Sequence, residues 1–415
     1  MIDHVYISAN CILIVGWANT DHNVEVRVTN LNKRMGEFGT TTRCERRDLV
    51  GIAGPKAGFE SLFFLSESDR VLEKQEVSVE VYINDQVARL ARKISLRTGY
   101  NQIRNHITHN FFEGRCTLDD AVQLLLPCLK HENTRLSAVP CSYEVIYSVH
   151  QTAEPADLLI VIPLYGNIGL IEHQLLFFAL SNFSANKYKI EIVFVIDDPK
   201  LVSHAKSKIT LLNDYVVGLP ISVIANEQNY GFAVACNAGF GFKKSDFTLF
   251  WNSDLFATDP NLLTSVLETL FSDESIVAAS PVLCNPDGVV QTTALEKRNH
   301  PEHKRYLIVE SSHRGMPYSQ LELDSKRVNI LSGGALIVRS EIFSKIGGFP
   351  THYGKGDFED AELTMRLSKF GSLKVLPNPV YHLLGLSFKR NLVETFCRSL
   401  MFSDFCTEFE EMIQQ

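Results

Sequence analysis

Apolar and polar residues alternate with a period of two through much of the first 95 residues. In segments 24–28 and 77–81, valines occupy every second position and polar residues lie between them. Successive side chains of a strand point to opposite faces, so this alternation predicts half-buried β-strands. Similar short runs occur at 6–15, 61–65 and 87–94. Together they predict a small antiparallel β-sandwich over residues 1–96.

Helical spacing replaces this alternation after residue 97. Thr117-Leu118-Asp119-Asp120 is a typical helix start, and the apolar residues after it recur three and four positions apart. A helical linker is therefore expected over residues 97–152. A second helical pattern predicts a C-terminal helix over 393–415. It either packs against the body of the protein or docks to a partner or membrane.

Between these segments, apolar strand patterns alternate with helical ones. Strands are expected at 158–163, 190–196, 221–225 and 248–251, with helices at 169–182, 201–213 and 231–243. Such alternation is typical of parallel strands joined by right-handed crossovers. The predicted fold class is thus α/β, with a mostly parallel sheet flanked by helices over residues 153–392. The small antiparallel sandwich precedes it.

Composition narrows the function classes. The 415 residues carry a formal net charge of -8, which argues against a protein that coats nucleic acid. The nine cysteines include no C-x-x-C pair, so neither a disulfide framework nor a zinc site is indicated, and a reducing cytoplasm is expected. No secretory signal is evident, and no apolar run approaches the roughly 20 residues that span a bilayer. Any membrane contact is expected to be peripheral.

Carboxylates follow two of the predicted strands. Asp197-Asp198 ends one strand, and Asn252-Ser253-Asp254 ends another. Open α/β sheets bind ligands at the carboxyl ends of their strands. A third pair, Glu359-Asp360, begins a predicted helix behind the glycine turn Gly347-Gly348-Phe349. A carboxylate pair in that position can hold a general base beside a bound sugar, so an enzyme is the leading interpretation.

Seven segments, in order, carry a family resemblance: Asn229-Tyr230-Gly231-Phe232-Ala233, Asn252-Ser253-Asp254, Asn285-Pro286-Asp287-Gly288, Gly333-Gly334-Ala335-Leu336-Ile337-Val338-Arg339, Gly347-Gly348-Phe349, Glu359-Asp360 and Tyr381-His382. Over about residues 156–390 the chain resembles the inverting glycosyltransferases of family 2, in particular their rhamnosyltransferase-like branch. The resemblance implies a GT-A fold, a nucleoside diphosphate sugar donor and a glycan or lipid-linked acceptor. It also implies Mg²⁺ or Mn²⁺ as cofactor and a role in surface polysaccharide synthesis.

The resemblance also implies donor-binding residues: Pro163, Tyr165, Asn167, Asp197, Asp198, Asn229, Gly231, Phe232, Asn252, Asp254, Gly333, Gly334 and Lys389. For Asp197 and Asp198, a role as strand-end turn carboxylates is the alternative, because Pro199-Lys200 replaces the small residues usual in the family. For Gly333-Gly334, loop geometry alone is the alternative.

The same resemblance assigns metal and catalytic roles. Asp254 and His382 would hold the cation, although Asn252 replaces the aspartate usual at the first position, which predicts a weaker metal affinity. A structural role is the alternative for His382. Asp360 would act as the general base, and Glu359 would orient it or the acceptor. Glu362 is expected to pair with Arg366 along the helix.

Other interpretations stay open at this point. A non-catalytic scaffold that binds a nucleotide-sugar or glycan is the alternative. Its only support is Asn252 and Glu362, and the presence of Asp254, Asp360 and His382 argues against it. A Rossmann oxidoreductase is disfavoured, because no G-x-G-x-x-G follows the first strand of the α/β region. The N-terminal sandwich either binds glycan, joins subunits into a homo-oligomer or braces the catalytic domain. Segment 291–330 is either a mobile loop on the acceptor side or a solvated surface.

Overall fold

The structure is a computed structural model that describes residues 2–7, 11–30, 33–34, 37–45, 53–54, 56–64, 78–83, 86–90, 100–137, 142–149, 153–181, 187–299, 306–323, 328–383 and 392–414. The chain forms two compact units. Unit 1 comprises Met1–Arg135 with Leu392–Met401, and unit 2 comprises Leu136–Asn391 with Phe402–Gln415. The helices expected as a linker fall mainly in unit 1.

Unit 1 holds two four-stranded antiparallel sheets. One has the order β1-β2-β6-β5 and the other β4-β3-β7-β8. Their bounds are β1 (Ile2–Ile7), β2 (Cys11–Trp17), β3 (Val24–Asn30), β4 (Lys33–Arg34), β5 (Glu37–Cys44), β6 (Gly58–Phe64), β7 (Ser78–Ile83) and β8 (Gln86–Leu90). Helices α2 (Tyr100–Phe112) and α3 (Leu118–Ser137) follow. The expected antiparallel β structure is confirmed. Strands β4 and β5 add to the predicted ones, and the predicted run at 6–15 covers parts of both β1 and β2.

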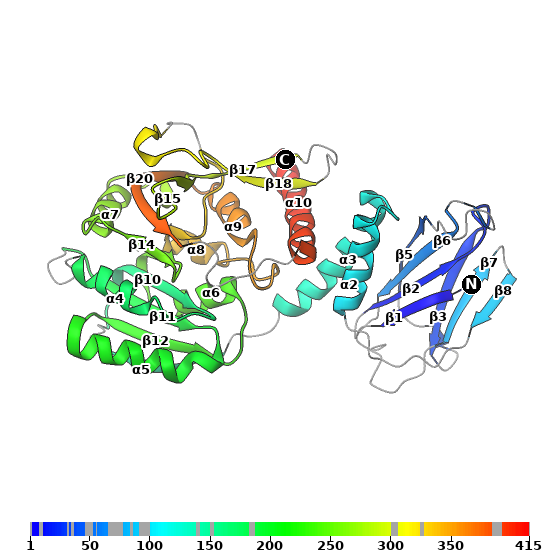
Figure 1. Ribbon diagram of the computed structural model, residues 1–415, viewed down its shortest axis with the longest axis horizontal. Coiled ribbons are helices and arrows are strands. Elements are labelled where there is room, and N and C mark those ends of the chain that lie inside the picture. The colour runs from blue at the N-terminus through cyan, green and yellow to red at the C-terminus, as the bar shows by residue number, and fades with distance from the viewer. Residues whose placement is uncertain are drawn as a thin grey trace. The chain divides into compact units, whose positions relative to one another are not determined.

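Unit 2 is built on a ten-stranded mixed sheet (Figure 1). Its order is β14-β20-β15-β19-β13-β10-β11-β12-β9, and β16 pairs with β15. The strands are β9 (Tyr143–Ser148), β10 (Ala156–Leu164), β11 (Ile190–Ile196), β12 (Ile221–Asn226), β13 (Ser245–Trp251), β14 (Leu255–Ala257), β15 (Ile276–Cys284), β16 (Val290–Thr292), β19 (Ala335–Arg339) and β20 (Ser372–His382). Strands β13, β10, β11 and β12 run parallel, as the sequence predicts.

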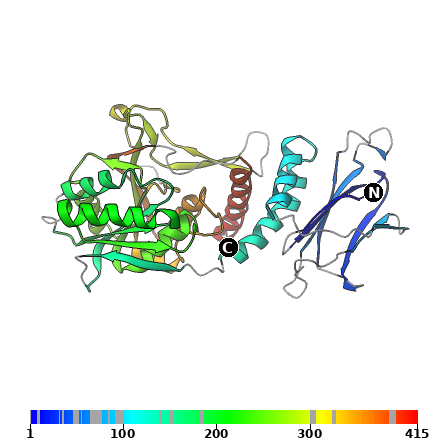
Figure 2. The ribbon, with the colours of Figure 1, turned by 60° about the horizontal axis from the view of Figure 1, so that its bottom comes forward.

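Helices cover both faces of this sheet. They are α4 (Ile171–Leu180), α5 (Val202–Leu212), α6 (Phe232–Phe242), α7 (Leu262–Ser272), α8 (Ser340–Lys345) and α9 (Glu359–Leu367), with the short helical turns η4 (Pro199–Leu201), η5 (Asn213–Val217) and η6 (Tyr318–Gln320). The α/β fold class is therefore confirmed. Helices α4 and α5 lie side by side on one face (Figure 2), where Lys208 and Glu172 form an ion pair at 2.7 Å.

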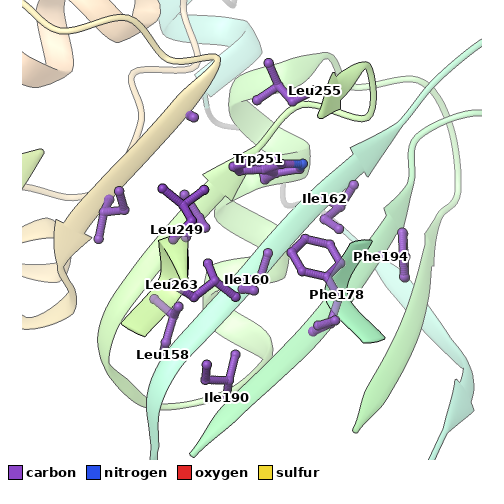
Figure 3. Close-up of a cluster of buried hydrophobic side chains, with 14 of the residues drawn as sticks. Leu158, Ile160, Ile162, Phe178, Ile190, Phe194, Leu249, Trp251, Leu255 and Leu263 are labelled. Atoms are coloured by element: carbon purple, nitrogen blue, oxygen red, sulfur yellow. The ribbon is translucent and has the colours of Figure 1, made fainter. Parts of the chain in front are cut away.

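The period-two pattern of β10 divides the core between the two faces. Leu158, Ile160 and Ile162 pack with α4, α5 and α7 in a cluster that includes Phe178 and Trp251 (Figure 3). The intervening Leu159 and Val161 pack on the other face with α6, α8 and α9. A strand buried on both faces reads as a continuous apolar run, which explains the pattern of this segment.

Two features extend beyond the predicted pattern. Strand β9 lies before the expected boundary near 152 and pairs antiparallel with β12 at the edge of the sheet. Segment 291–330 contains a hairpin of β17 (Leu295–Asn299) and β18 (Leu307–Ser311). Helix α10 (Leu392–Gln414) lies where the C-terminal helix is expected, and its residues from Phe402 onward belong to unit 2. None of the helices in the described ranges is long and apolar enough to cross a membrane.

Candidate active site

The carboxyl ends of the four parallel strands meet at one edge of the sheet. The backbone N–H of Asp197, directly after β11, donates to the carbonyl of Leu164 at the end of β10 at 2.9 Å. Tyr165, one residue further along, is exposed at this edge. Asn252-Ser253-Asp254 follows β13 on the other side of β10. The topology therefore gathers the predicted donor residues where an α/β sheet binds ligands.

Gln174 of α4 holds the turn that carries Asp254. Its side-chain amide donates to the carbonyls of Ser253 at 3.0 Å and Leu255 at 2.6 Å, and its oxygen accepts from Trp251 Nε1 at 2.8 Å. Gln174 is almost fully buried, so these bonds are shielded from water. The indole of Trp251 also stacks on Phe177 in the core. Trp251 is therefore part of the core and holds the turn from below.

Asp254 and His382 lie side by side. Strand β14 pairs with β20, which places Leu255 opposite His382, and the N–H of Leu383 donates to the carbonyl of Asp254 at 3.0 Å. His382 Nε2 is 3.2 Å from Asp254 Oδ1, and the side chains are only 14% and 5% exposed. The other ring nitrogen, Nδ1, lies 2.9 Å from Oε1 of Gln291.

This pair has the chemistry of a divalent cation site that a substrate completes. A carboxylate and an imidazole suit Mn²⁺, and Mg²⁺ is commonly held by one or two carboxylates plus substrate phosphates. Within the described ranges, no group of three or more His, Cys, Asp or Glu side chains forms a metal cluster. The nearby Asn252 Oδ1 is buried and accepts no hydrogen bond from the described residues. The residues present therefore fit a cation that Asp254 and His382 would hold together with oxygens of a bound diphosphate.

The turn Gly333-Gly334 connects this edge to Asp360. The N–H of Asn252 donates to the carbonyl of Gly334 at 2.9 Å, and the N–H of Gly333 donates to Asp360 Oδ2 at 2.7 Å. A Cβ added at Gly333 would lie 2.8 Å from the Cβ of Asp360, so only glycine fits there. The structure thus brings Asp360 and the Asn252–Asp254 turn to the two sides of one glycine pair.

Asp360 has the environment of a base. Burial raises its pKa above the ordinary aspartate value, while hydrogen bonds from the N–H groups of Gly333 and Ala361 partly offset the rise. The Ala361 N–H donates to Oδ1 at 2.8 Å. An ionised carboxylate has about four lone-pair sites, so acceptor capacity remains after these two bonds. A raised pKa makes a carboxylate a stronger proton acceptor.

The backbone in front of Asp360 is strained. Asp357 and Phe358 have φ angles of 81° and 71°, in the left-handed region that residues with a Cβ rarely adopt. The ring of Phe358 stacks on Phe402 of α10 at a centroid distance of 5.3 Å, and Phe402 is fully buried. Glu359 is also buried in the first turn of α9. Backbone strain of this kind is common at functional sites.

Glu362 is fully buried and paired from three sides. It accepts from Tyr353 Oη at 2.7 Å, contacts His352 Nε2 at 3.1 Å and forms an ion pair with Arg366. Burial tends to raise its pKa, but His352, Arg366 and Tyr353 outweigh this and hold the pKa below its ordinary value. The expected pair with Arg366 is confirmed. Glu362 anchors the segment that leads into α9.

Asp197 is turned into the protein. It is 3% exposed and accepts from Asn226 Nδ2 at 2.8 Å and from the N–H groups of Tyr230 at 3.0 Å and Gly231 at 2.8 Å. Burial nevertheless raises its pKa above the ordinary value. These contacts indicate that Asp197 shapes the loop before α6.

Gly231 is required by the chain's own packing. Its φ is 93°, and an added Cβ would lie 2.5 Å from the carbonyl oxygen of Gly354. The family resemblance implies a donor-binding role for this glycine; the structure shows that it admits the segment that leads to Asp360. Asn237 of α6 fixes the neighbouring glycine turn by two bonds of 2.9 Å with the backbone of Phe349.

The remaining predicted donor residues lie around this edge. Asn167 Oδ1 accepts from the N–H of Gly169 at 2.7 Å, Asp198 accepts from Lys200 N–H at 3.1 Å, and Asn229 accepts from Gly231 N–H at 3.1 Å. Phe232 packs edge-on against Phe349, and Pro163 is half-buried. Lys389 lies outside the described residues.

Two amides of this site, Gln174 and Gln291, are not among the predicted residues. Gln174 lies in a helix of otherwise largely apolar residues, where a single polar side chain on a buried face is the available signal. Gln291 follows the Asn285-Pro286-Asp287-Gly288 turn and precedes two threonines, so its own position carries no distinctive pattern. Both are recognised only from their partners in space.

Residues 159–347 match the model of the glycosyl transferase family 2. This stretch is a glycosyltransferase family 2 domain. The match covers β10 to α8 and thus the strand ends that carry Asp197, Asp254 and Gly333. The family expected from the sequence is confirmed, and glycosyl transfer is the activity of that family. The rhamnosyltransferase-like branch stays a prediction.

Several solved structures are distantly similar to this chain. The mannosyltransferase PcManGT from Pyrobaculum calidifontis, in complex with GDP-Man and Mn²⁺, is 15% identical at a TM-score of 0.39, over 69% of each chain. GalNAc-T7 with UDP, GalNAc and Mn²⁺ is 16% identical at a TM-score of 0.40, over 56% of this chain and 44% of that one. TarS 1–349 of S. aureus in complex with UDP-GlcNAc is 17% identical at a TM-score of 0.39, over 58% of this chain and 60% of that one. No curated protein matches the sequence.

Proposed function

We propose that the protein is an inverting glycosyltransferase that moves a sugar from a nucleoside diphosphate sugar to a hydroxyl of a glycan or lipid-linked acceptor. One observation carries the proposal: Asp360 and the Asn252–Asp254 turn lie on the two sides of the Gly333-Gly334 pair. A base for the acceptor and a binding edge for the donor are what direct displacement at a sugar carbon requires. The product fits a growing surface polysaccharide.

Asp360 takes the proton of the attacking hydroxyl. The acceptor oxygen forms its bond to the anomeric carbon while the bond from that carbon to the diphosphate oxygen breaks. A single displacement of this kind inverts the anomeric centre. The proton passes to Asp360, and the negative charge leaves on the diphosphate.

Asp254 and His382 are the residues that would hold Mg²⁺ or Mn²⁺. The cation would supply positive charge to the departing diphosphate. Asn252, whose buried Oδ1 accepts no hydrogen bond from the described residues, would accept one from a hydroxyl of the donor. Tyr165 and Asp198, at the adjacent strand ends, would face the nucleotide. The assignment of the α/β part of the chain, residues 153–392, as the catalytic domain is part of this proposal.

The test is the variant Asp360→Asn, which keeps the size of the side chain but removes the base. General-base catalysis contributes about 10²- to 10⁴-fold, so kcat for transfer should fall by that factor while donor binding persists. The matched control is Glu341→Gln, the same chemical change at an exposed position of α8.

Donor binding is first established by thermal stabilisation with a panel of nucleoside diphosphate sugars, with and without Mn²⁺. Unchanged transfer by Asp360→Asn would refute the role of Asp360. Donor binding without transfer by the unmodified protein would favour a binding scaffold.

A further inference from the structure

His382 is held between two side chains. Its Nε2 atom faces Asp254 Oδ1 at 3.2 Å, and its Nδ1 atom faces Gln291 Oε1 at 2.9 Å. A neutral imidazole carries one N–H donor and one lone pair, and the hydrogen bond made by one nitrogen decides the state of the other. The partner of Nδ1 therefore bears directly on what Nε2 can bind.

The sheet places Gln291 at this position. Strand β16 pairs with β15 through Cys284 and Val290, and β15 pairs with β20 through Cys284 and Tyr381. Val290 and Thr292 are buried, and Gln291 between them is half-buried, because successive side chains of a strand point to opposite faces. Backbone pairing thus brings the amide to the histidine without help from a flexible loop.

We propose that Gln291 is a positioning residue for the cation site. Its Oε1 accepts the Nδ1–H of His382, so the ring is fixed in one orientation and the lone pair of Nε2 is directed toward the side of Asp254. The inference rests on the proposed function, since it concerns the cation that Asp254 and His382 would share. Histidines that bind metals usually donate their other N–H in this way, and loss of the acceptor typically costs about 10- to 100-fold in metal affinity.

Two substitutions of Gln291 distinguish a hydrogen-bonding role from a role in packing alone. Methionine at 291 has nearly the length and volume of glutamine but no acceptor for the Nδ1–H. Glutamate at 291 keeps an acceptor oxygen at the same reach. If the hydrogen bond sets the ring, Gln291→Met lowers cation affinity and Gln291→Glu retains it. If shape alone matters, both variants behave like the unmodified protein.

The experiment measures Mn²⁺ binding by electron paramagnetic resonance of the free ion. The full-length protein is titrated with Mn²⁺ alone and with Mn²⁺ plus inorganic pyrophosphate, which stands in for the diphosphate of the donor. Gln291→Met should weaken binding by about 10- to 100-fold, and Gln291→Glu should restore it. The matched control is Gln320→Met, the same change at an exposed position of η6, which should bind as the unmodified protein does. His382→Leu marks the affinity without the imidazole.

Two results would overturn the inference. Gln291→Met could bind Mn²⁺ as tightly as the unmodified protein, or the unmodified protein could bind no more tightly than His382→Leu. Neither result depends on catalysis, so each is distinguishable from failure of the proposed function. Loss of Mn²⁺ affinity in Gln291→Met, together with full transfer by Asp360→Asn, would keep the role of Gln291 and refute only that of Asp360.

Discussion

At Asp360, burial and hydrogen bonding act on the carboxylate in opposite directions, and burial prevails. The group is held by Gly333 and Ala361 through backbone N–H donors, so its position depends on the turn and not on another charged side chain. The backbone fixes the direction of the carboxylate, while the low polarity of its surroundings strengthens it as a proton acceptor. Both effects suit a general base.

The raised pKa predicts a specific pH dependence of stability. Asp360 holds its proton more tightly in the folded state, so its contribution to stability is present below the ordinary aspartate range and is lost as pH rises through the folded-state pKa. Asp360→Asn has no such group. Its free energy of unfolding relative to the unmodified protein should therefore increase with pH across this window and then level off. Urea unfolding from about pH 3.5 to 8 measures it.

Asp197, whose pKa is also raised by burial, is present in both proteins, so its contribution cancels in this comparison. A difference between the two proteins that stays constant with pH would contradict the shift assigned to Asp360.

Gln174 provides a second prediction at this scale. Replacing it by methionine leaves the Trp251 Nε1–H and the carbonyls of Ser253 and Leu255 without their buried partner. Each unsatisfied group costs roughly 1–3 kcal/mol, so the loss of all three partners should lower the free energy of unfolding by at least about 3 kcal/mol. Urea unfolding measures the change, with Gln320→Met as the control. Because Asp254 lies between those two carbonyls, Mn²⁺ affinity should fall as well. If Gln174→Met were as stable as the control, the turn that carries Asp254 would not depend on Gln174.

At the scale of elements, α9 depends on α10 for its position. Phe402 stacks on Phe358, Arg366 lies over the ring of Phe405, and Cys406 Sγ is 3.9 Å from Met365 Sδ. The hairpin β17–β18 joins the same part of α10, where Leu307 N–H donates to Ser403 Oγ at 2.9 Å. The second half of α10 is thus packed against α9 and the β17–β18 hairpin within unit 2, which is the first of the two roles expected for the C-terminal helix.

This packing predicts different effects for two phenylalanines of α10. Phe402→Ala should lower the free energy of unfolding by about 3–5 kcal/mol. It should also lower kcat on the order of tenfold to a hundredfold, because Phe358 leads directly into the helix of Asp360. Phe409 is equally buried but packs on Phe405 and Lys369. Phe409→Ala should therefore lower stability and leave kcat nearly unchanged. Denaturant unfolding and kcat at saturating substrate test the pair. Equal kcat values for the two variants would contradict a role of Phe402 in positioning α9.

At the scale of the whole molecule, the sequence predicts what depends on local pattern. The apolar runs at 158–163 and 190–196 become adjacent parallel strands, and the residues after them lie at one edge because parallel strands share a direction. Contacts between distant segments are not available from such patterns. Asp197 follows a strand like a ligand residue, yet Asn226, Tyr230 and Gly231 occupy its oxygens. The pairing of β9 with β12, and the partners of Gln174 and Gln291, likewise depend on tertiary packing.

The two left-handed residues before α9 limit how the protein can be stabilised by design. Glycine at 358 would relax the backbone but remove the aromatic ring that stacks on Phe402. Asparagine at 357 tolerates the left-handed conformation but lacks the charge of the native carboxylate. Variants selected for heat resistance in this segment are therefore expected to lose turnover, since the conformation that costs stability is also the one that aims Asp360.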